Sequence, residues 1–462
     1  MSITAERHIQ LLENASNLAR EAAEFALAHG IIRYVDGGGV THLPLSLVPW
    51  KAESSFVEET RELTVLYNDL YHRVAQDTDF LSRHLGTARS ADEFIAHLFQ
   101  ALEQERPGKP ALYLNRNDCM PASTPTGVWP KQVEMNLMAS ALGEASAKVY
   151  EMHRYLYRHN PLAANLVDNS AGEGLTWALN EGYRAIGNPG VVLYLVPDGE
   201  PNAFGQRISE VRLHRLYGVP TARTNLETLG REGELRDGVL YFRDEPVAIA
   251  YFRSGYAPHH YPNEYAWKAR QLIEASTAVS VPNARTQLAN TKMIQLKLAR
   301  RELLEQFVSP EVADRLLKSM VGFANLGQEI EWHGQKAPAR ELALANPDAW
   351  VLKPHREGGG NNYFGDQMVA KLGSITEREA EAFILMEKIV QDPFRSVRLV
   401  NHEPVPCECF TEMGFFGLAY YPDVEREPVF NQARGYLLRT KDTSMDEGLV
   451  LGGFSFLDAA VV

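Results

Sequence analysis

Apolar side chains recur at helical spacing along the first hundred residues. One stripe covers residues 9–26 and a second covers residues 56–74, each on a single face of a 3.6-residue period. Ser90 stands three residues before Glu93, which is the spacing of a capping box that would begin a third helix. A further helix is expected over residues 145–159. The N-terminal region is therefore predicted to be mainly helical.

The apolar pattern changes near residue 190. The run Val191–Val196 is uninterrupted, which is typical of a strand buried on both faces of a parallel sheet. Helical spacing follows at 208–217. Two apolar runs at 239–242 and 247–252, joined by a short polar turn, then predict a hairpin. Strand, helix and hairpin in this order predict an α/β subdomain over about residues 189–289.

The last third of the chain mixes both kinds of element. Ser309-Pro310 suits the cap and first residue of a helix. A short apolar run at 349–352 predicts a strand that enters a glycine-rich segment. Thr376 and Glu379 match a capping box, and residues 383–386 predict another strand. These patterns indicate an α+β fold with a sheet core and more than one lobe.

Composition and charge narrow the partners that the chain is expected to bind. The 462 residues include 46 Lys and Arg against 59 Asp and Glu, a net charge of −13. An acidic surface disfavours nucleic acid and anionic membranes, although it permits a local basic pocket. No apolar run reaches the roughly 18 residues that a membrane helix needs. The charged N-terminus is unlike a secretory leader, so we expect neither a leader nor a membrane partner.

The cysteines favour a reducing compartment. Three of them, Cys119, Cys407 and Cys409, are too few for a disulfide framework, which fits the cytosol. Cys407 and Cys409 form a C-x-C pair that a strand would place on one face. A metal site needs further soft ligands, and the flanking PVPCECF supplies none. We therefore expect buried, packed thiols at these positions.

The richest polar segment is VLKPHREGGGNNYFG, residues 351–365. Lys353 leaves a strand, and Gly358-Gly359-Gly360 frees the backbone so that successive N–H groups can converge on phosphate oxygens. Glu357 offers a hard carboxylate of the kind that Mg²⁺ prefers. A surface turn is the alternative, and we assign it to Gly37-Gly38-Gly39, which lacks a preceding lysine. Residues 358–360 are predicted to bind phosphate.

Two other segments offer a metal ligand pair and a nucleotide wall. Glu134 and Asn136 alternate in an extended segment, so that both face the same way and suit Mg²⁺. A polar strand face is the alternative. Met386 packs at the end of an apolar run ahead of Lys388, an arrangement that could border a purine, although a core strand would look the same.

Arginines and lysines at strand ends supply candidate anion contacts. Arg439 and Lys441 alternate on one predicted strand, ahead of a glycine-punctuated segment, 448–453, that could close as a lid. Arg116 and Arg253 each follow an apolar run and could clamp a carboxylate with two hydrogen bonds. Each arginine taken alone could equally be a surface residue, so their convergence is the decisive observation.

Eight short segments of the chain occur in the order of one family's motifs. They are LNRND (114–118), KQVEMN (131–136), NAFGQR (202–207), YFRSGY (251–256), TQLANTK (286–292), LKPHREGGGNN (352–362), LMEKI (385–389) and LLRTK (437–441). Taken together they resemble the eukaryotic-type glutathione synthetases, an ATP-grasp ligase family. The resemblance implies an α+β (α/β) ATP-grasp fold with an inserted α/β substrate-binding domain and an N-terminal helical region. The corresponding regions are 1–188 (helices and part of the core), 189–289 (substrate domain) and 290–462 (ATP-grasp domain with lid).

The same resemblance implies an activity and assigns residues to it. The reaction is ATP-dependent joining of γ-glutamylcysteine to glycine through an acyl phosphate, with Mg²⁺. By position, Glu134, Asn136 and Glu357 resemble the metal ligands. The ATP contacts would be Lys292, Lys353, Gly358, Gly359, Gly360, Asn362, Met386, Lys388, Glu412 and Lys441. The substrate contacts would be Arg116, Asn202, Gln206, Arg253, Tyr256, Arg439, Val450 and Leu451, with Arg116 and Arg439 in catalytic roles. A cytoplasmic homodimer with no nucleic-acid or membrane partner is implied as well.

Departures from the family pattern keep a second hypothesis open. In the family, two serines usually follow the pair that corresponds to Glu134 and Asn136, whereas this chain has Ala139 and Ala141 at those positions. At a lid position expected to surround the acceptor amine, this chain has Leu451. It has Phe364 where the family has a tyrosine near the glycine-rich segment. The alternative is a homologous ligase that uses β-alanine, serine or another amine. A nucleotide-binding protein without turnover is a third possibility, which the three retained metal-type ligands argue against.

Overall fold

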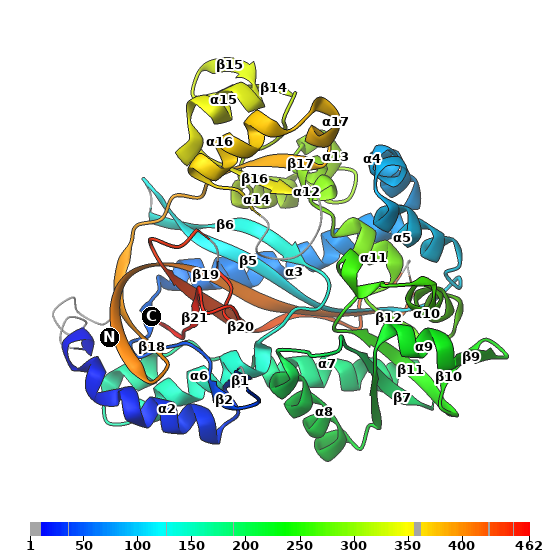
Figure 1. Ribbon diagram of the computed structural model, residues 1–462, viewed down its shortest axis with the longest axis horizontal. Helices are drawn as coiled ribbons and strands as arrows, with labels where there is room; N and C mark the ends of the chain where they lie inside the picture. Colours follow the sequence, from blue (N-terminus) through cyan, green and yellow to red (C-terminus); the bar gives the residue numbers. More distant parts are fainter. Residues whose placement is uncertain are drawn as a thin grey trace.

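A computed structural model describes residues 11–35, 37–125, 127–187, 189–354, 362–423, 426–446 and 448–462. Figure 1 shows a central sheet, an α/β unit at one end of it and a smaller lobe above it. The central sheet has seven strands in the order β18-β3-β21-β20-β19-β5-β6. Their bounds are β3 Leu45–Ser46, β5 Ala111–Thr124, β6 Gly127–Asn136, β18 Phe394–Val400, β19 Glu403–Tyr421, β20 Phe430–Asp442 and β21 Phe456–Leu457.

The central sheet combines strands that are far apart in the sequence. The long strand β19 lies between β5 and β20 and is antiparallel to both, with Gly414 opposite Asp118 and Glu412 opposite Arg439. Helix α3 (Ser54–Gln76) contacts β5, β6, β19 and β20, and helices α6 (Gly143–Leu156) and α7 (Ala171–Ile186) also contact β20. Ser146 of α6 donates a hydrogen bond to the carbonyl of Tyr436 on β20. This sheet forms the floor of the site described below.

The α/β unit agrees with its sequence pattern. Strand β7 (Val191–Leu195) is parallel to β8 (Thr221–Thr224) and β11 (Glu245–Phe252), and all five of its residues are buried. Strands β10 (Val239–Phe242) and β11 form the predicted hairpin. The remaining elements of this unit are α8 Ala203–Tyr217, α9 Leu226–Glu232, β9 Gly233–Arg236, η3 Pro258–His260, α10 Glu264–Ala275 and β12 Val279–Val281.

The smaller lobe has a three-stranded antiparallel sheet in the order β13-β17-β16 and a core of its own. Ser309 caps α14 and Thr376 begins α17 in a capping box, as predicted. The elements are α14 Pro310–Ser319, β13 Phe323–Asn325, β14 Glu329–Trp332, β15 Gln335–Pro338, α15 Ala339–Ala345, η4 Pro347–Ala349, β16 Trp350–Pro354, α16 Gly365–Ser374, α17 Glu377–Ala380 and β17 Phe383–Glu387. Helices α11 Ala284–Ala289, α12 Lys292–Leu298 and α13 Arg301–Leu304 lead into this lobe.

The N-terminal region is helical, but one predicted cap is wrong. Helix α4 continues through Ser90, whose hydroxyl donates to the carbonyl of Gly86, and Asp92 instead caps the next helix through the N–H of Phe94. The other elements there are η1 Ala15–Leu18, α2 Ala19–Ala28, β1 Ile32–Tyr34, β2 Val40–His42, β4 Trp50–Lys51, α4 Thr78–Ala91, α5 Glu93–Glu103 and η2 Pro161–Asn165. Strand β22 (Ala460–Val461) pairs with β4. Among the described residues, no helix is long and apolar enough to cross a membrane.

Candidate functional site

A cavity of about 400 Å³ lies between the central sheet and the smaller lobe. Its walls come from β6, β16, β17, β19 and β20, so that segments more than 300 residues apart in the sequence meet there. Eight residues singled out from the sequence line it: Glu134, Lys353, Asn362, Met386, Lys388, Glu412, Arg439 and Lys441. The structure therefore brings six of the expected nucleotide residues together, whereas Lys292 does not line the cavity and contacts Glu134. Glu357 and Gly358–Gly360, which were expected to join them, lie outside the described residues.

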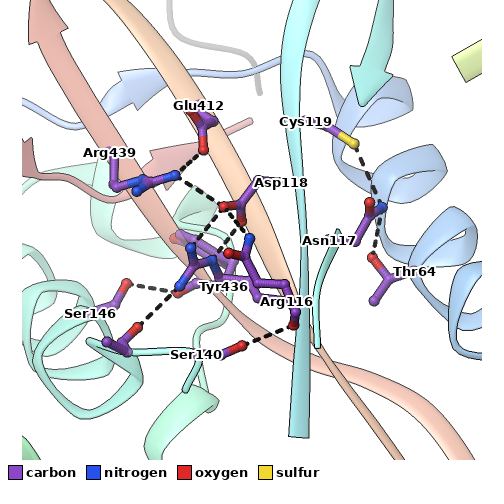
Figure 2. A network of polar contacts seen from close by, with 12 residues as sticks. Thr64, Arg116, Asn117, Asp118, Cys119, Ser140, Ser146, Glu412, Tyr436 and Arg439 are labelled. Atoms are coloured by element: carbon purple, nitrogen blue, oxygen red, sulfur yellow. Dashed lines mark hydrogen bonds and ion pairs between the residues drawn. The ribbon is translucent and has the colours of Figure 1, made fainter. Parts of the chain in front are cut away.

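Arg116 and Arg439 converge on a carboxylate that sequence reasoning did not assign (Figure 2). Arg116 donates from Nε to Asp118 Oδ1 at 2.5 Å and from Nη2 to Oδ2 at 2.7 Å. Arg439 Nη2 donates to Asp118 Oδ2 at 3.0 Å. Asp118 is buried, as is Arg116, so each charge depends on the other for stabilisation. The available signal was the spacing of two residues in LNRND, which places both side chains on one face of β5.

A glycine makes room for this cluster. Gly414 stands opposite Asp118 in the neighbouring strand β19. A Cβ atom at this position would overlap Asp118 Oδ1 and lie 2.8 Å from Arg116 Cδ. The absence of a side chain therefore lets the Arg116–Asp118 pair lie flat over the sheet.

Arg439 also pairs with Glu412, its direct partner across β19 and β20. Burial alone would lower the pKa of Arg439, but the carboxylates of Glu412 and Asp118 outweigh it and raise that pKa. The guanidinium therefore stays charged at physiological pH. Its two carboxylate partners come from two different strands, so its position is fixed on both sides.

Glu134 is an ionised carboxylate beside a lysine. Lys292 Nζ donates to Glu134 Oε2 at 3.1 Å. Burial acts to raise the pKa of Glu134, but the positive charges of Lys292, Lys353 and Arg439 outweigh it and lower the pKa to about 2. An oxygen donor that remains charged at neutral pH suits a hard divalent cation.

Asn136 lies two residues further along β6, on the same face as Glu134. Its Nδ2 donates to Asp118 Oδ2 at 2.9 Å, which turns the amide so that Oδ1 is the atom left to act as a ligand. A carboxylate and an amide oxygen side by side fit Mg²⁺ chemically. Within the part of the chain that the structure describes, no three His, Cys, Asp or Glu residues form a metal-binding group.

A second, smaller cavity of about 30 Å³ holds three of the expected substrate residues, Asn202, Gln206 and Arg253. Arg253 is buried and donates from Nη1 to the carbonyl of Ser140 at 2.9 Å. Gln206 Oε1 accepts from Arg223 Nη2 at 2.6 Å. Burial raises the pKa of Tyr256, whose ring packs against His260 at 4.4 Å; it is not among the residues lining this cavity.

The segment that follows Asn136 is held by both candidate substrate arginines, and two of its residues, Ser140 and Leu142, line the smaller cavity. Arg116 donates to the carbonyl of Ala141 at 3.4 Å, and Arg253 to that of Ser140. Ala139 has φ of +52° and Leu142 φ of +68°, so the segment turns sharply between them. Because both arginines hold backbone carbonyls, the replacement of serine by alanine at 139 and 141 leaves these contacts intact.

The C-terminal segment closes the first cavity on one side. Gly448 and Leu449 line it, and Arg439 Nη1 donates to the Gly448 carbonyl at 3.5 Å. Val450 is buried in the main core, and Leu451 packs against that core. Val450 and Leu451, which were predicted to surround the acceptor amine, thus directly follow the two cavity-lining residues Gly448 and Leu449. Phe364 lines the cavity as well, a role the sequence suggested only as a departure from the family pattern.

Comparisons with known proteins identify relatives along nearly the whole chain. Residues 12–462 match the family described as eukaryotic glutathione synthase, ATP binding domain. The chain is 33% identical to glutathione synthetase from Bos taurus over 96% of both chains, and 32% identical to that from Homo sapiens over 97% of both. It is 34% identical to the chloroplastic glutathione synthetase of Solanum lycopersicum, over 92% of this chain and 78% of that one. A glutathione synthetase-like effector from Globodera pallida has the same fold, with a TM-score of 0.77 at 18% identity over 98% of this chain and 97% of that one.

Proposed function

The chain belongs to the eukaryotic glutathione synthetase family, and from this premise we propose that its two cavities join γ-glutamylcysteine to glycine at the expense of ATP. The family is one of ATP-dependent ligases, and the relatives cover this chain almost completely. The observation that supports the assignment to this site is the convergence of Arg116 and Arg439 on Asp118, where Arg439 lines the same cavity as Lys353 and Lys441 and the other two residues lie behind it.

The arrangement suits transfer of a phosphoryl group to a carboxylate. Both reactants are anions, so their approach needs concentrated positive charge held in a fixed geometry. Lys292, Lys353 and Lys441 would hold the triphosphate, with Gly358–Gly360 covering it. Arg116 and Arg439 would face the reacting carboxylate and stabilise the charge that develops on the acyl phosphate. No side-chain nucleophile is needed, because ATP activates the carboxylate directly.

Magnesium would be held by Glu134, Asn136 and Glu357. When bound, it would neutralise charge on the phosphate oxygens and orient them. The protein's own contribution is to keep Glu134 ionised through Lys292, Lys353 and Arg439, and to orient the Asn136 amide through Asp118.

The other end of the main cavity would take the nucleoside. Met386 offers an apolar surface at the end of β17, and its neighbours Glu387 and Lys388 donate backbone N–H groups to Gly322 and Ala349. The backbone of this segment is therefore fixed. Lys388, Glu412 and Asn362 would supply polar contacts to the base, ribose and phosphates.

The smaller cavity would receive the γ-glutamyl end of the dipeptide. Arg253 would pair with its carboxylate, and Asn202, Gln206 and Tyr256 would complete the contacts. Arg439, Val450 and Leu451 would surround the acceptor amine. Leu451 is bulkier than the small residue expected at this point, which favours as a second candidate a ligase for another amine such as β-alanine or serine.

One assay distinguishes these acceptors. Phosphate release is measured with ATP, Mg²⁺, γ-glutamylcysteine and a panel of glycine, β-alanine and serine. We expect kcat/KM to be highest with glycine and phosphate release to require the dipeptide. A higher kcat/KM with another amine would show that this amine, and not glycine, is the acceptor. ATP binding without phosphate release for any acceptor would contradict a ligase.

We further propose a cytoplasmic homodimer and the three regions 1–188, 189–289 and 290–462. The first and third regions share the central sheet, because each of them contributes strands to it. Sedimentation velocity would test the dimer.

A further inference from the structure

Cys407 and Cys409 are in contact on strand β19. Cys409 Sγ donates to Cys407 Sγ at 3.2 Å, and neither cysteine is in a disulfide. Cys409 is fully buried, whereas Cys407 is partly exposed. The pair thus has one thiol that solutes can reach and a second thiol directly behind it.

The two thiols differ in the way that thiol–disulfide exchange requires. The hydrogen bond from Cys409 and the charge of Arg398 lower the pKa of Cys407, despite partial burial. A thiolate is the attacking species in such exchange. Cys119 is the internal contrast, since it is fully buried, its pKa is raised by burial, and it has no second thiol beside it.

The pair adjoins the nucleotide cavity. Cys409 is opposite Asp442 across β19 and β20, and the next pair along is Phe410 with Lys441, both of which line the cavity. The carbonyl of Glu408, between the two cysteines, accepts from the N–H of Thr443 at 2.9 Å. Thr443 lines the cavity too. A shift of the backbone between residues 407 and 409 would therefore also move Lys441 and Thr443, which pair with this part of β19 and line the cavity.

Closing a disulfide at this spacing would bend the strand. Residues i and i+2 of a strand have Cα atoms about 6.7 Å apart, and most disulfides hold them at about 5.5–6 Å. A disulfide also holds its two Cβ atoms about 3.5–4.5 Å apart, which is closer than same-face neighbours on a regular strand. Closure is therefore expected to shorten the chain locally and to shift the Glu408–Thr443 hydrogen bond and the adjoining pairs.

We propose that Cys407 and Cys409 form a thiol–disulfide exchange site for low-molecular-weight disulfides, and that its oxidation weakens nucleotide binding. The Cys407 thiolate attacks one sulfur of a disulfide RSSR, and RS⁻ leaves and takes up a proton. Cys409 then loses its proton and attacks Cys407 Sγ, which releases the second RSH. The sum is two protein thiols plus RSSR giving one intramolecular disulfide plus two RSH. The coupling rests on the nucleotide site proposed above, whereas the exchange itself does not.

The test uses the full chain in buffers of 2-mercaptoethanol and bis(2-hydroxyethyl) disulfide, neither of which is a substrate. Mass spectrometry after alkylation should show loss of two hydrogens in the peptide containing Cys407 and Cys409. Calorimetry with a non-hydrolysable ATP analogue should show at least about fivefold weaker binding in the oxidised protein. Dithiothreitol should restore both values.

Three variants locate the effect. C407S should neither form the disulfide nor change its affinity with the buffer ratio, C409S should retain a mixed disulfide at Cys407, and C119S should behave as the parent chain does. Absence of a Cys407–Cys409 disulfide at every ratio would overturn the exchange site. A disulfide with unchanged affinity for the analogue would overturn its coupling to the nucleotide, provided that the reduced protein binds the analogue. If C409S does not fold, C407S and C119S still decide the question.

Discussion

Arg439 Nη2 lies 3.0 Å from Asp118 Oδ2, although 321 residues separate the two in the sequence. Asp118 is on β5 and Arg439 is on β20, with β19 between them. The contact therefore crosses the intervening strand β19, and Glu412 of that strand holds the same arginine. A single buried carboxylate thus fixes the relative positions of Arg116 and Arg439.

The first prediction concerns that carboxylate. Asp118→Asn keeps the shape of the side chain but removes the charge that compensates the buried guanidinium of Arg116 and the partly buried one of Arg439. A hydrogen bond to a charged group contributes about 1.5–3 kcal/mol, which corresponds to a fall in kcat of roughly 10- to 160-fold. Because Asp118 is not among the residues that line the nucleotide cavity, the KM for ATP should change much less. Steady-state kinetics with both substrates varied would measure the two effects separately.

Asp69→Asn is the matched control for that variant. Asp69, a partly exposed carboxylate of α3, pairs with Arg73 and accepts from the Tyr421 hydroxyl at 3.3 Å, but it does not line the nucleotide cavity, and partly exposed ion pairs of this kind contribute little. Its kcat should match that of the parent chain. Equal kcat values for Asp118→Asn and the parent would remove Asp118 from its positioning role.

A second prediction changes no polar group at all. Gly414→Ala introduces a Cβ that overlaps Asp118 Oδ1 and crowds Arg116 Cδ, so the arginine–carboxylate pair must move. We expect kcat to fall by at least about tenfold, with a loss of stability of about 1–3 kcal/mol from overpacking. Gly86→Ala is the control, since a Cβ there has no atom within 4 Å and alanine favours the helix. Urea unfolding and kinetics of both variants would be compared, and unchanged kcat in Gly414→Ala would contradict the close fit.

The third prediction addresses magnesium. Glu134→Gln keeps an oxygen donor but removes the charge that Lys292, Lys353 and Arg439 hold ionised. The Mg²⁺ concentration for half-maximal activity should rise about tenfold or more, because a hard cation binds a neutral amide more weakly than a carboxylate. Glu53→Gln, a change at a residue outside the cavity, should leave the titration where it is in the parent chain. An identical magnesium titration for Glu134→Gln and the parent would exclude Glu134 as a ligand.

The elements that the sequence predicted best depend on neighbouring residues alone. The stripe at 56–74 became α3, the 239–252 pattern became the β10–β11 hairpin, and the Thr376 box begins α17. The cap at Ser90 was wrong because another capping residue, Asp92, lies two positions later, and the preceding helix extends through Ser90. Local patterns fix which element forms more securely than the residue at which it begins.

The arrangement of the site depends on register between distant strands, which local patterns do not contain. The motifs placed Arg116 and Arg439 on strands, but their meeting requires Gly414 opposite Asp118 and Glu412 opposite Arg439. The same sheet also includes β3, which lies between β18 and β21 and, with two residues, is too short to give any alternation. Asp118 was missed for this reason, since nothing near it in the sequence indicates that a second arginine approaches.

The last prediction is a pH dependence of stability that originates in Asp458. Its Oδ1 accepts from Ser46 Oγ at 2.5 Å and from the N–H of Ala459 at 2.7 Å, and its Oδ2 accepts from Thr440 Oγ1 at 3.0 Å. Burial raises its pKa to about 7, well above the ordinary value of 3.8. Between these values the folded chain binds a proton that the unfolded chain has lost. Stability from this group is therefore present below about pH 4 and decreases as the pH rises to 7, by at most about 1.4 kcal/mol per pH unit.

Asp458→Asn removes this titration and keeps an oxygen acceptor for Ser46 and Ala459. The free energy of unfolding of the variant should therefore fall less, relative to the parent chain, between pH 5 and pH 8. Glu144, whose pKa burial raises to about 7, titrates in both proteins, so its contribution cancels in the difference. Urea unfolding at four pH values would give both curves, and parallel curves would show that Asp458 is ionised in the folded chain throughout. Curves for the variant and the parent that converge as the pH rises would show that Asp458 is protonated in the folded chain at lower pH. This proton would lie beside Thr440, which stands between Arg439 and Lys441 on β20.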